Sequence, residues 1–202
     1  MSDPHSQDLG HGIHRVETGL YRHGLAACYL LVEQGRAAVI DTGTSHTAPR
    51  LLALLDRLGL GPEAVDYVIP THVHLDHAGG AGALMAACPD ARLVVHPRGA
   101  PHLVDPSRLA AGARAVYGEG EFARLFGDLV PVPGERVDTA PDGHRVDLAG
   151  RVLEFLDTPG HANHHACIWD PRSGGLFTGD TFGISYRELD TADGPFLFAP
   201  TT

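Results

Sequence analysis

The sequence contains no lysine, since all 15 basic residues among its 202 are arginine. Enzymes that form a Schiff base, or that hold a nucleotide phosphate with a P-loop lysine, are therefore excluded. Cysteine is also scarce, with 3 residues and no CxxC pair. A disulfide framework or a thiolate metal site is therefore not expected, and we interpret Cys28, Cys88 and Cys167 as small buried apolar residues.

The sequence also lacks long hydrophobic runs and a net positive charge. No apolar stretch approaches the ~20 residues that span a bilayer, and residues 1–6 show neither the basic nor the apolar region of a signal peptide. We therefore expect a cytoplasmic protein without a membrane partner. The formal net charge of −10 disfavours a nucleic-acid partner, which normally requires a basic face. The length suits one domain over 1–202 that acts on a small-molecule substrate.

The order of apolar patterns predicts an α/β fold. The first half should contain strands at 27–32, 37–40, 65–69 and 92–96, and helices at 48–58, 81–87 and 105–126. Past Pro133 the pattern changes to short strands at 145–148, 152–156, 165–169 and 176–178. Strands and helices thus alternate first, and a strand-rich part follows. No helix pattern closes the tail after Asp180.

Histidine is abundant, with 14 residues. The densest cluster directly follows the buried strand at 65–69, the usual place for a site in an α/β sheet, and comprises His72, His74, Asp76 and His77. In an extended segment His72 and His74 point the same way. A helix start with Asp76 as N-cap is the alternative, although three histidines are not a usual cap.

Two further candidates, His161 in Thr-Pro-Gly-His and Asp180 in Thr-Gly-Asp, also follow predicted strands. Alone, His161 could be a solvated loop residue and Asp180 a turn residue. Together the three pieces supply four imidazoles and two carboxylates, which suit two divalent metal ions a few ångströms apart. Zinc is the expected metal, with iron and manganese as the other candidates.

This ordered set resembles the metallo-β-lactamase superfamily, and the resemblance spans residues 41–180. It implies an αβ/βα sandwich in which His72, His74 and His161 hold the first ion. Asp76 and His77 would hold the second ion, and Asp180 would bridge the two. Asp41, in an Asp-Thr-Gly turn, resembles the family's Asp that orients these ligands, and a plain Asx-turn is the alternative.

The resemblance also implies a hydrolase in which a metal-bound hydroxide attacks an ester, thioester or lactone carbonyl. Asp76 or Asp180 would be the catalytic group that orients the water. Asp180 stands where β-lactamase branches often carry Cys, which favours the glyoxalase II-like and lactonase-like branches. No basic cluster for the carboxylates of glutathione is evident. The alternatives are a mononuclear-iron persulfide dioxygenase-like enzyme and a truncated, inactive metal-binding domain.

The sequence departs from the family in one respect. A further histidine ligand of the second metal is usual near the end of the domain, but no histidine follows His165. We therefore expect that the C-terminal portion of the domain is missing, or that a second copy in a homo-oligomer completes the site. The second metal site would then be only partly occupied. Tyr186 could stabilise an oxyanion, although a packed aromatic residue is the simpler interpretation, and strand packing is the simpler one for His165.

Overall fold

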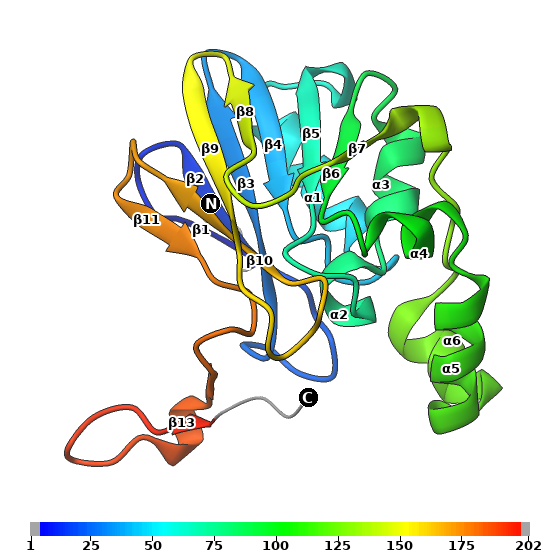
Figure 1. Ribbon diagram of the computed structural model, residues 1–202. Helices are drawn as coiled ribbons and strands as arrows, with labels where there is room; N and C mark the ends of the chain where they lie inside the picture. Colours follow the sequence, from blue (N-terminus) through cyan, green and yellow to red (C-terminus); the bar gives the residue numbers. More distant parts are fainter. Residues whose placement is uncertain (1–4, 199–202) are drawn as a thin grey trace.

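The apolar runs of the first half form a seven-stranded sheet in the computed structural model, which describes residues 5–198 (Figure 1). Its strands lie side by side in sequence order: β1 (Ser6–Asp8), β2 (Ile13–Glu17), β3 (Ala27–Glu33), β4 (Arg36–Ile40), β5 (Val65–Ile69), β6 (Arg92–Val95) and β7 (Val137–Thr139). Strands β1 to β4 are antiparallel, whereas β4 to β7 are parallel. The last four residues of β4 are all buried, as a strand covered on both faces requires.

Helices lie on one face of this sheet and beyond the ends of its strands (Figure 1). They are α1 (Ala48–Arg57), α2 (Leu75–Ala78), α3 (Ala81–Ala87), α4 (Ala100–Val104), α5 (Ser107–Tyr117) and α6 (Glu119–Phe126). In α1, Leu51, Leu54 and Leu55 recur at helical spacing and are buried, and Gly59 follows the helix with a φ of 75°. Side chains of α1, α3 and α4 join those of the sheet in one hydrophobic cluster.

A second, four-stranded antiparallel sheet packs on the other face. Its strands, in the order β11-β10-β9-β8, are β8 (Arg145–Leu148), β9 (Arg151–Asp157), β10 (Ala166–Asp170) and β11 (Gly175–Phe177). Leu153 and Phe155 of β9 alternate with more exposed residues. Together with Ile168 of β10 they join Leu31 and Ile40 of the larger sheet in a second core. The α/β class and the sandwich architecture are therefore confirmed.

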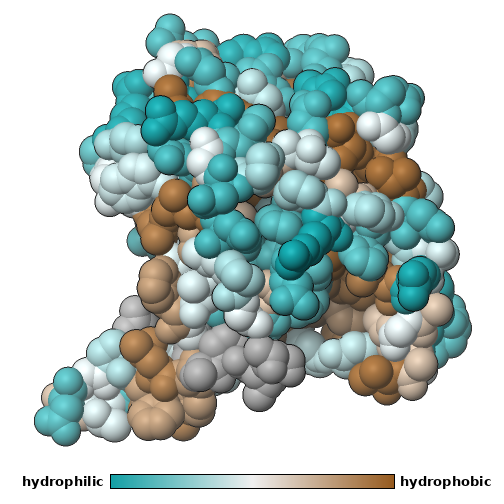
Figure 2. Space-filling view, in the orientation of Figure 1, coloured by the Kyte–Doolittle hydropathy of each residue, from teal (hydrophilic) through white to brown (hydrophobic). Residues whose placement is uncertain are grey.

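The chain leaves the sandwich after Asp180 and forms an arm that ends in the hairpin β12 (Ile184–Ser185) and β13 (Leu197–Phe198), with the 3₁₀ turn Arg187–Leu189 between them (Figure 1). Apolar side chains gather on this arm at the lower left of Figure 2, where Phe182, Phe196 and Leu197 are exposed. As expected, no α-helix occurs in the described part of the tail.

Most element positions agree with the sequence-based predictions, but some details differ. The strands β1, β2 and β7 were not expected, because they are short and carry polar residues. The predicted helical stretch at 105–126 is divided at Gly118, whose φ of 76° is not helical, and its first helix, α5, begins only after Pro106. Among the described residues, no helix is long and apolar enough to cross a membrane.

Candidate metal centre

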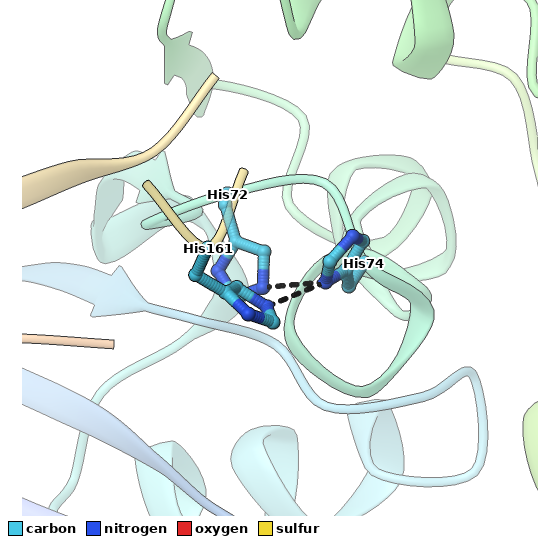
Figure 3. Close-up of side chains that lie close together, drawn as sticks. All are labelled: His72, His74 and His161. Atoms are coloured by element: carbon cyan, nitrogen blue, oxygen red, sulfur yellow. Dashed lines mark hydrogen bonds between the residues drawn. The ribbon is translucent and has the colours of Figure 1, made fainter. Parts of the chain in front are cut away.

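Three histidines from the two sheets meet at one point (Figure 3). His72 and His74 follow β5 of the larger sheet, and His161 lies in the loop between β9 and β10 of the smaller one. The Nδ1 atom of His74 is 3.0 Å from Nε2 of His72 and 2.9 Å from Nε2 of His161. His72 is fully buried, whereas His74 and His161 are partly buried, so the three nitrogen atoms converge at the end of the strands between the core and the surface.

A second donor group shares His72 with the first. It comprises His72, His77 and Asp180, whose donor atoms lie within 4.8 Å of one another. Oδ1 of Asp180 is 3.2 Å from Nε2 of His77, and its Oδ2 is 3.5 Å from Nε2 of His161. Asp180 thus faces both groups. Asp76 lies at their edge, with Oδ2 3.5 Å from Nε2 of His77.

Asp41 fixes the orientation of two of these histidines. Its carboxylate accepts hydrogen bonds from the backbone N–H of Thr71 at 2.7 Å and from Nδ1 of His77 at 2.8 Å. It also accepts the hydroxyl hydrogen of Thr71, so the Thr71 oxygen is left to accept from Nδ1 of His72 at 3.1 Å. The Nε2 lone pair of a neutral His72 therefore points into the centre, which is the form that binds a metal.

His165 contacts the backbone of Asp180 and holds it in position. The backbone N–H of Asp180 donates to Nε2 of His165 at 3.2 Å, while Nδ1 of His165 faces the hydroxyl of Thr158 at 2.9 Å. A Cβ on Gly179, whose φ is 47°, would lie 2.6 Å from the His165 ring, so only glycine allows this approach. His165 is therefore part of the support of the site, and strand packing alone does not describe it.

The donor chemistry fits divalent cations. His74 Nδ1 faces two imidazole nitrogens but can hold only one hydrogen, so it cannot satisfy both without a cation. The His161 ring points its Nε2 atom into the centre. Its other nitrogen, Nδ1, is buried and has no hydrogen-bond partner. Imidazole and carboxylate donors at this spacing suit zinc or a similar ion.

The pKa shifts of the histidines also favour a site that binds cations. Burial and the neighbouring imidazoles hold the pKa of His72 below the usual histidine value, and the same causes lower the pKa of His74. Burial also acts to lower the pKa of His77, but Asp41 and Asp180 outweigh it and raise that pKa well above the usual value. Without a metal, a protonated His77 thus supplies the positive charge that the surrounding carboxylates require.

The turn after β4 holds the histidine segment in place. Thr42 donates its backbone N–H to the carbonyl of His77 at 2.6 Å, and Gly80 donates to the carbonyl of Gly43 at 2.9 Å. A Cβ on Gly80 would lie 2.6 Å from the carbonyl oxygen of Thr44. Gly80 therefore allows the histidine segment to approach this turn closely.

The second donor group borders a pocket of about 600 Å³. The pocket lies between the loop that joins β2 to β3, helices α5 and α6, and residues 176–186. His74, Asp76, His77 and Asp180 line it on one side. A small molecule in the pocket would thus reach the donor atoms.

The structure brings five of the six predicted ligands into the two donor groups, with Asp76 beside them, and Asp41 contacts both His77 and Thr71. It also reveals contributions that the sequence-based interpretation missed, namely those of Thr71 and His165. The position of Thr71 next to His72 was the only available signal. Tyr186 packs against Phe198 with ring centroids 5.9 Å apart, in agreement with a packed aromatic residue.

The fold and these motifs define a family. A family model described as the metallo-beta-lactamase superfamily matches residues 21–201, and the chain belongs to this superfamily. The expected resemblance is therefore confirmed.

Curated relatives cover the chain well, but the chain covers them only in part. A metallo-beta-lactamase fold-containing protein of Sulfurisphaera tokodaii is 26% identical over 181 residues, which are 87% of this chain and 64% of that protein. A hydroxyacylglutathione hydrolase of Synechococcus sp. (strain JA-3-3Ab) is 33% identical over 150 residues, which are 74% of this chain and 45% of the hydrolase. The chain thus spans about half to two thirds of the length of these relatives.

Solved structures agree with this assignment. The crystal structure of an archaeal superfamily protein from Sulfolobus tokodaii has a TM-score of 0.70 at 25% identity, over 87% of this chain and 66% of that one. A metallo-beta-lactamase from Cronobacter sakazakii has a TM-score of 0.63 at 26% identity, over 85% of this chain and 60% of that one.

Proposed function

We propose that the protein is a metal-dependent hydrolase that cleaves an ester, thioester or lactone with water. The observation that carries this proposal is the pair of donor groups that share His72 beside a pocket. Relatives named hydroxyacylglutathione hydrolase support the reaction type. In the reaction the bond between the acyl carbon and its oxygen or sulfur leaving group breaks, water supplies the hydroxyl, and the leaving group takes the remaining proton.

The distances between the donor atoms support a ligand assignment. His72, His74 and His161 would hold one ion, while His77 and Asp180, with Asp76 beside them, would hold the second. We propose zinc for both positions. Such ions supply Lewis acidity, which activates water and polarises a carbonyl group.

The chain's own residues position the reactants. The Asp180 carboxylate is partly exposed to the pocket, so it can accept a hydrogen bond from the attacking water and take up its proton. Burial would raise the pKa of Asp180, but the hydrogen bond from His77 outweighs this effect and lowers it, which keeps the carboxylate ionised. Asp41 holds His77 and His165 holds the backbone of Asp180, so both act as positioning residues.

Metal content and hydrolysis test the proposal together. We expect protein purified without added metal to contain up to two ions per chain by elemental analysis and to hydrolyse simple esters. The variant His161→Ala should lose the first ion and more than 100-fold in kcat/KM, because it removes one of three donors. His23→Ala is the matched control, since this exposed histidine contacts only Glu17 among the described contacts.

Full metal content in His161→Ala would show that the ligand assignment is wrong. One iron per chain together with oxygen uptake would support the dioxygenase alternative instead. Bound metal without hydrolysis of any ester would indicate an inactive metal-binding domain. The cytoplasmic location and a homo-oligomer that completes the site stay predictions.

A further inference from the structure

The wall of the pocket that faces the donor atoms is apolar. Leu20 and Leu25, in the loop that joins β2 to β3, pack against helices α5 and α6. Leu20 and Phe126 are buried in a small cluster of their own, and Ala113 of α5 is partly buried against it. All four residues also line the pocket. This loop and these helices therefore form a preassembled hydrophobic surface beside the candidate metal centre.

The same surface continues along the sheets to the donor atoms. Tyr29 of β3 and Phe177 of β11 both line the pocket, and their ring centroids are 5.1 Å apart in an edge-to-face arrangement. Phe177 is followed three residues later by Asp180. An apolar group that lies on this wall would thus have its end next to the second donor group.

Tyr21 extends the wall at the mouth of the pocket. Its φ of 54° is uncommon for a residue with a side chain, and such strain persists where the surroundings hold it in place. Burial, with the charge of Tyr117 and a hydrogen bond to it, raises the pKa of Tyr21. Tyr21 and Tyr117 both line the pocket, so the loop and α5 contribute neighbouring aromatic side chains to it.

Cations are absent from the described lining of the pocket. Its acidic residues are Asp41, Asp76 and Asp180, and none of the lining side chains that the structure describes belongs to arginine. Two arginines near the mouth are already paired, Arg22 with Glu188 and Arg124 with Glu121. A substrate carboxylate on the apolar wall would thus lose its hydration without gaining a partner, which is costly.

We propose that this wall is an acyl subsite, and that the substrate is an uncharged ester or thioester with an apolar acyl chain of several carbons. The inference rests on the proposed hydrolase function and narrows its substrate class. It separates this chain from relatives named for hydroxyacylglutathione, since glutathione carries two carboxylates.

A chain-length series tests the inference. With p-nitrophenyl esters from acetate to octanoate, kcat/KM should rise about four-fold per methylene until the wall is covered, which corresponds to the transfer of ~0.8 kcal/mol per buried CH₂ group. S-lactoylglutathione should be a poor substrate, at least 100-fold below the octanoate ester. Equal rates for all esters, or a preference for the glutathione thioester, would overturn the inference. Hydrolysis of no substrate at all would instead count against the proposed function.

A binding measurement on chelator-treated protein is independent of turnover. The neutral probe N-phenyl-1-naphthylamine should bind with a rise in fluorescence, and octanamide should displace it, whereas glutathione should not. In Ala113→Trp the indole fills the subsite, so probe binding should fall more than ten-fold and the octanoate-to-acetate ratio of kcat/KM should fall by a similar factor. Ala115→Trp is the matched control, since Ala115 lies on the same helix, is exposed and does not line the pocket. Probe binding that is equally weakened in both variants, or unchanged in Ala113→Trp, would contradict the placement of the subsite.

Discussion

Asp41 organises the centre although its side chain belongs to neither donor group. It is buried, has a φ of 54°, and accepts hydrogen bonds from Thr71 and His77. An Asx-turn needs only local contacts, whereas these partners lie 30 and 36 residues away in the sequence. The long-range contacts thus favour the orienting role over the simple turn.

The substitution Asp41→Asn should weaken the second ion selectively. An asparagine tolerates the positive φ and can still accept from Thr71, but its amide group cannot accept the Nδ1 hydrogen of His77. We expect metal affinity at that position to fall 10- to 100-fold, with the first ion retained, in a competition titration with a chromophoric chelator. Asp66→Asn, which alters a carboxylate paired with Arg36 away from the centre, is the control. Equal affinities for both ions in Asp41→Asn and the unmodified protein would rule out this role.

His165 should make the metal-free protein sensitive to acid. Burial is the main cause that lowers its pKa from 6.5 to about 4. Between these two pH values the unfolded chain binds a proton at His165 that the folded chain does not bind. The contribution of neutral His165 to the free energy of unfolding is therefore complete above about pH 6.5, and it is lost as the pH falls toward 4. Thermal melting of chelator-treated protein should show a midpoint that falls over this window. The slope should be shallower in His165→Gln, and parallel curves would contradict the assignment.

At this scale the sequence predicted the donors and, through the family resemblance, the orienting residue Asp41, but it did not predict the supporting roles of Thr71 and His165. His72, His74 and His77 stand out because several metal-competent side chains rarely fall within six residues by chance. The roles of Thr71 and His165 depend on hydrogen bonds to Asp41 and to the backbone of Asp180, which lie at the ends of other strands, and no local pattern encodes such contacts.

Helices and strands could be predicted from the sequence where a regular apolar pattern extends over the whole element. The helix over 48–58 and the strand over 65–69 agree with α1 and β5 almost to the residue, because each buries a regular set of side chains. The strands β1, β2 and β7 gave weaker signals, since edge or short strands expose polar residues and derive their order from pairing with neighbours.

Substitution by alanine should change the stability of the protein in opposite directions at two helical glycines, Gly82 and Gly112. A Cβ on Gly82 of α3 would lie 1.7 Å from the carbonyl oxygen of Val130, whereas a Cβ on Gly112 of α5 would meet nothing within 4 Å. We expect Gly82→Ala to lower the free energy of unfolding by about 1–3 kcal/mol through overpacking. Gly112→Ala should raise it by up to ~1 kcal/mol through helix propensity. Urea unfolding of both variants measures these changes, and a shift of the same sign in both would contradict this packing.

For the molecule as a whole, a buried arginine of the smaller sheet reaches across to the larger one. Arg151 of β9 is fully buried, pairs with the buried Asp170 of β10, and donates to the carbonyl of His11 at 2.7 Å. His11 lies in the turn between β1 and β2 of the larger sheet. The contact therefore stabilises the docking of one sheet on the other.

Replacement of Arg151 should lower the stability of the protein substantially. In Arg151→Met the carboxylate of Asp170 stays buried without its charged partner, and we expect the free energy of unfolding to fall by about 3–5 kcal/mol. Arg145→Met removes an exposed arginine that pairs with Glu154 and should cost less than about 1 kcal/mol. Guanidinium unfolding of the two variants provides the comparison. A similar loss in both would show that burial of the pair is unimportant.

The overall sandwich could be predicted because the motifs occur in the order of a known family. The docking of the sheets and the course of the arm could not be predicted in the same way. Contacts such as that between Arg151 and His11 join residues 140 positions apart, and nothing in the surrounding sequence specifies them.

The separation of the donors along the chain has a consequence for synthesis on the ribosome. His72 and His74 emerge first, whereas His161 and Asp180 follow about a hundred residues later. A nascent chain that has passed residue 77 offers only fragments of each donor group, so the complete centre can capture an ion only after the strand that precedes Asp180 has left the exit tunnel. Metal loading would therefore follow the synthesis of the strands of both sheets and could not guide the folding of the first ones.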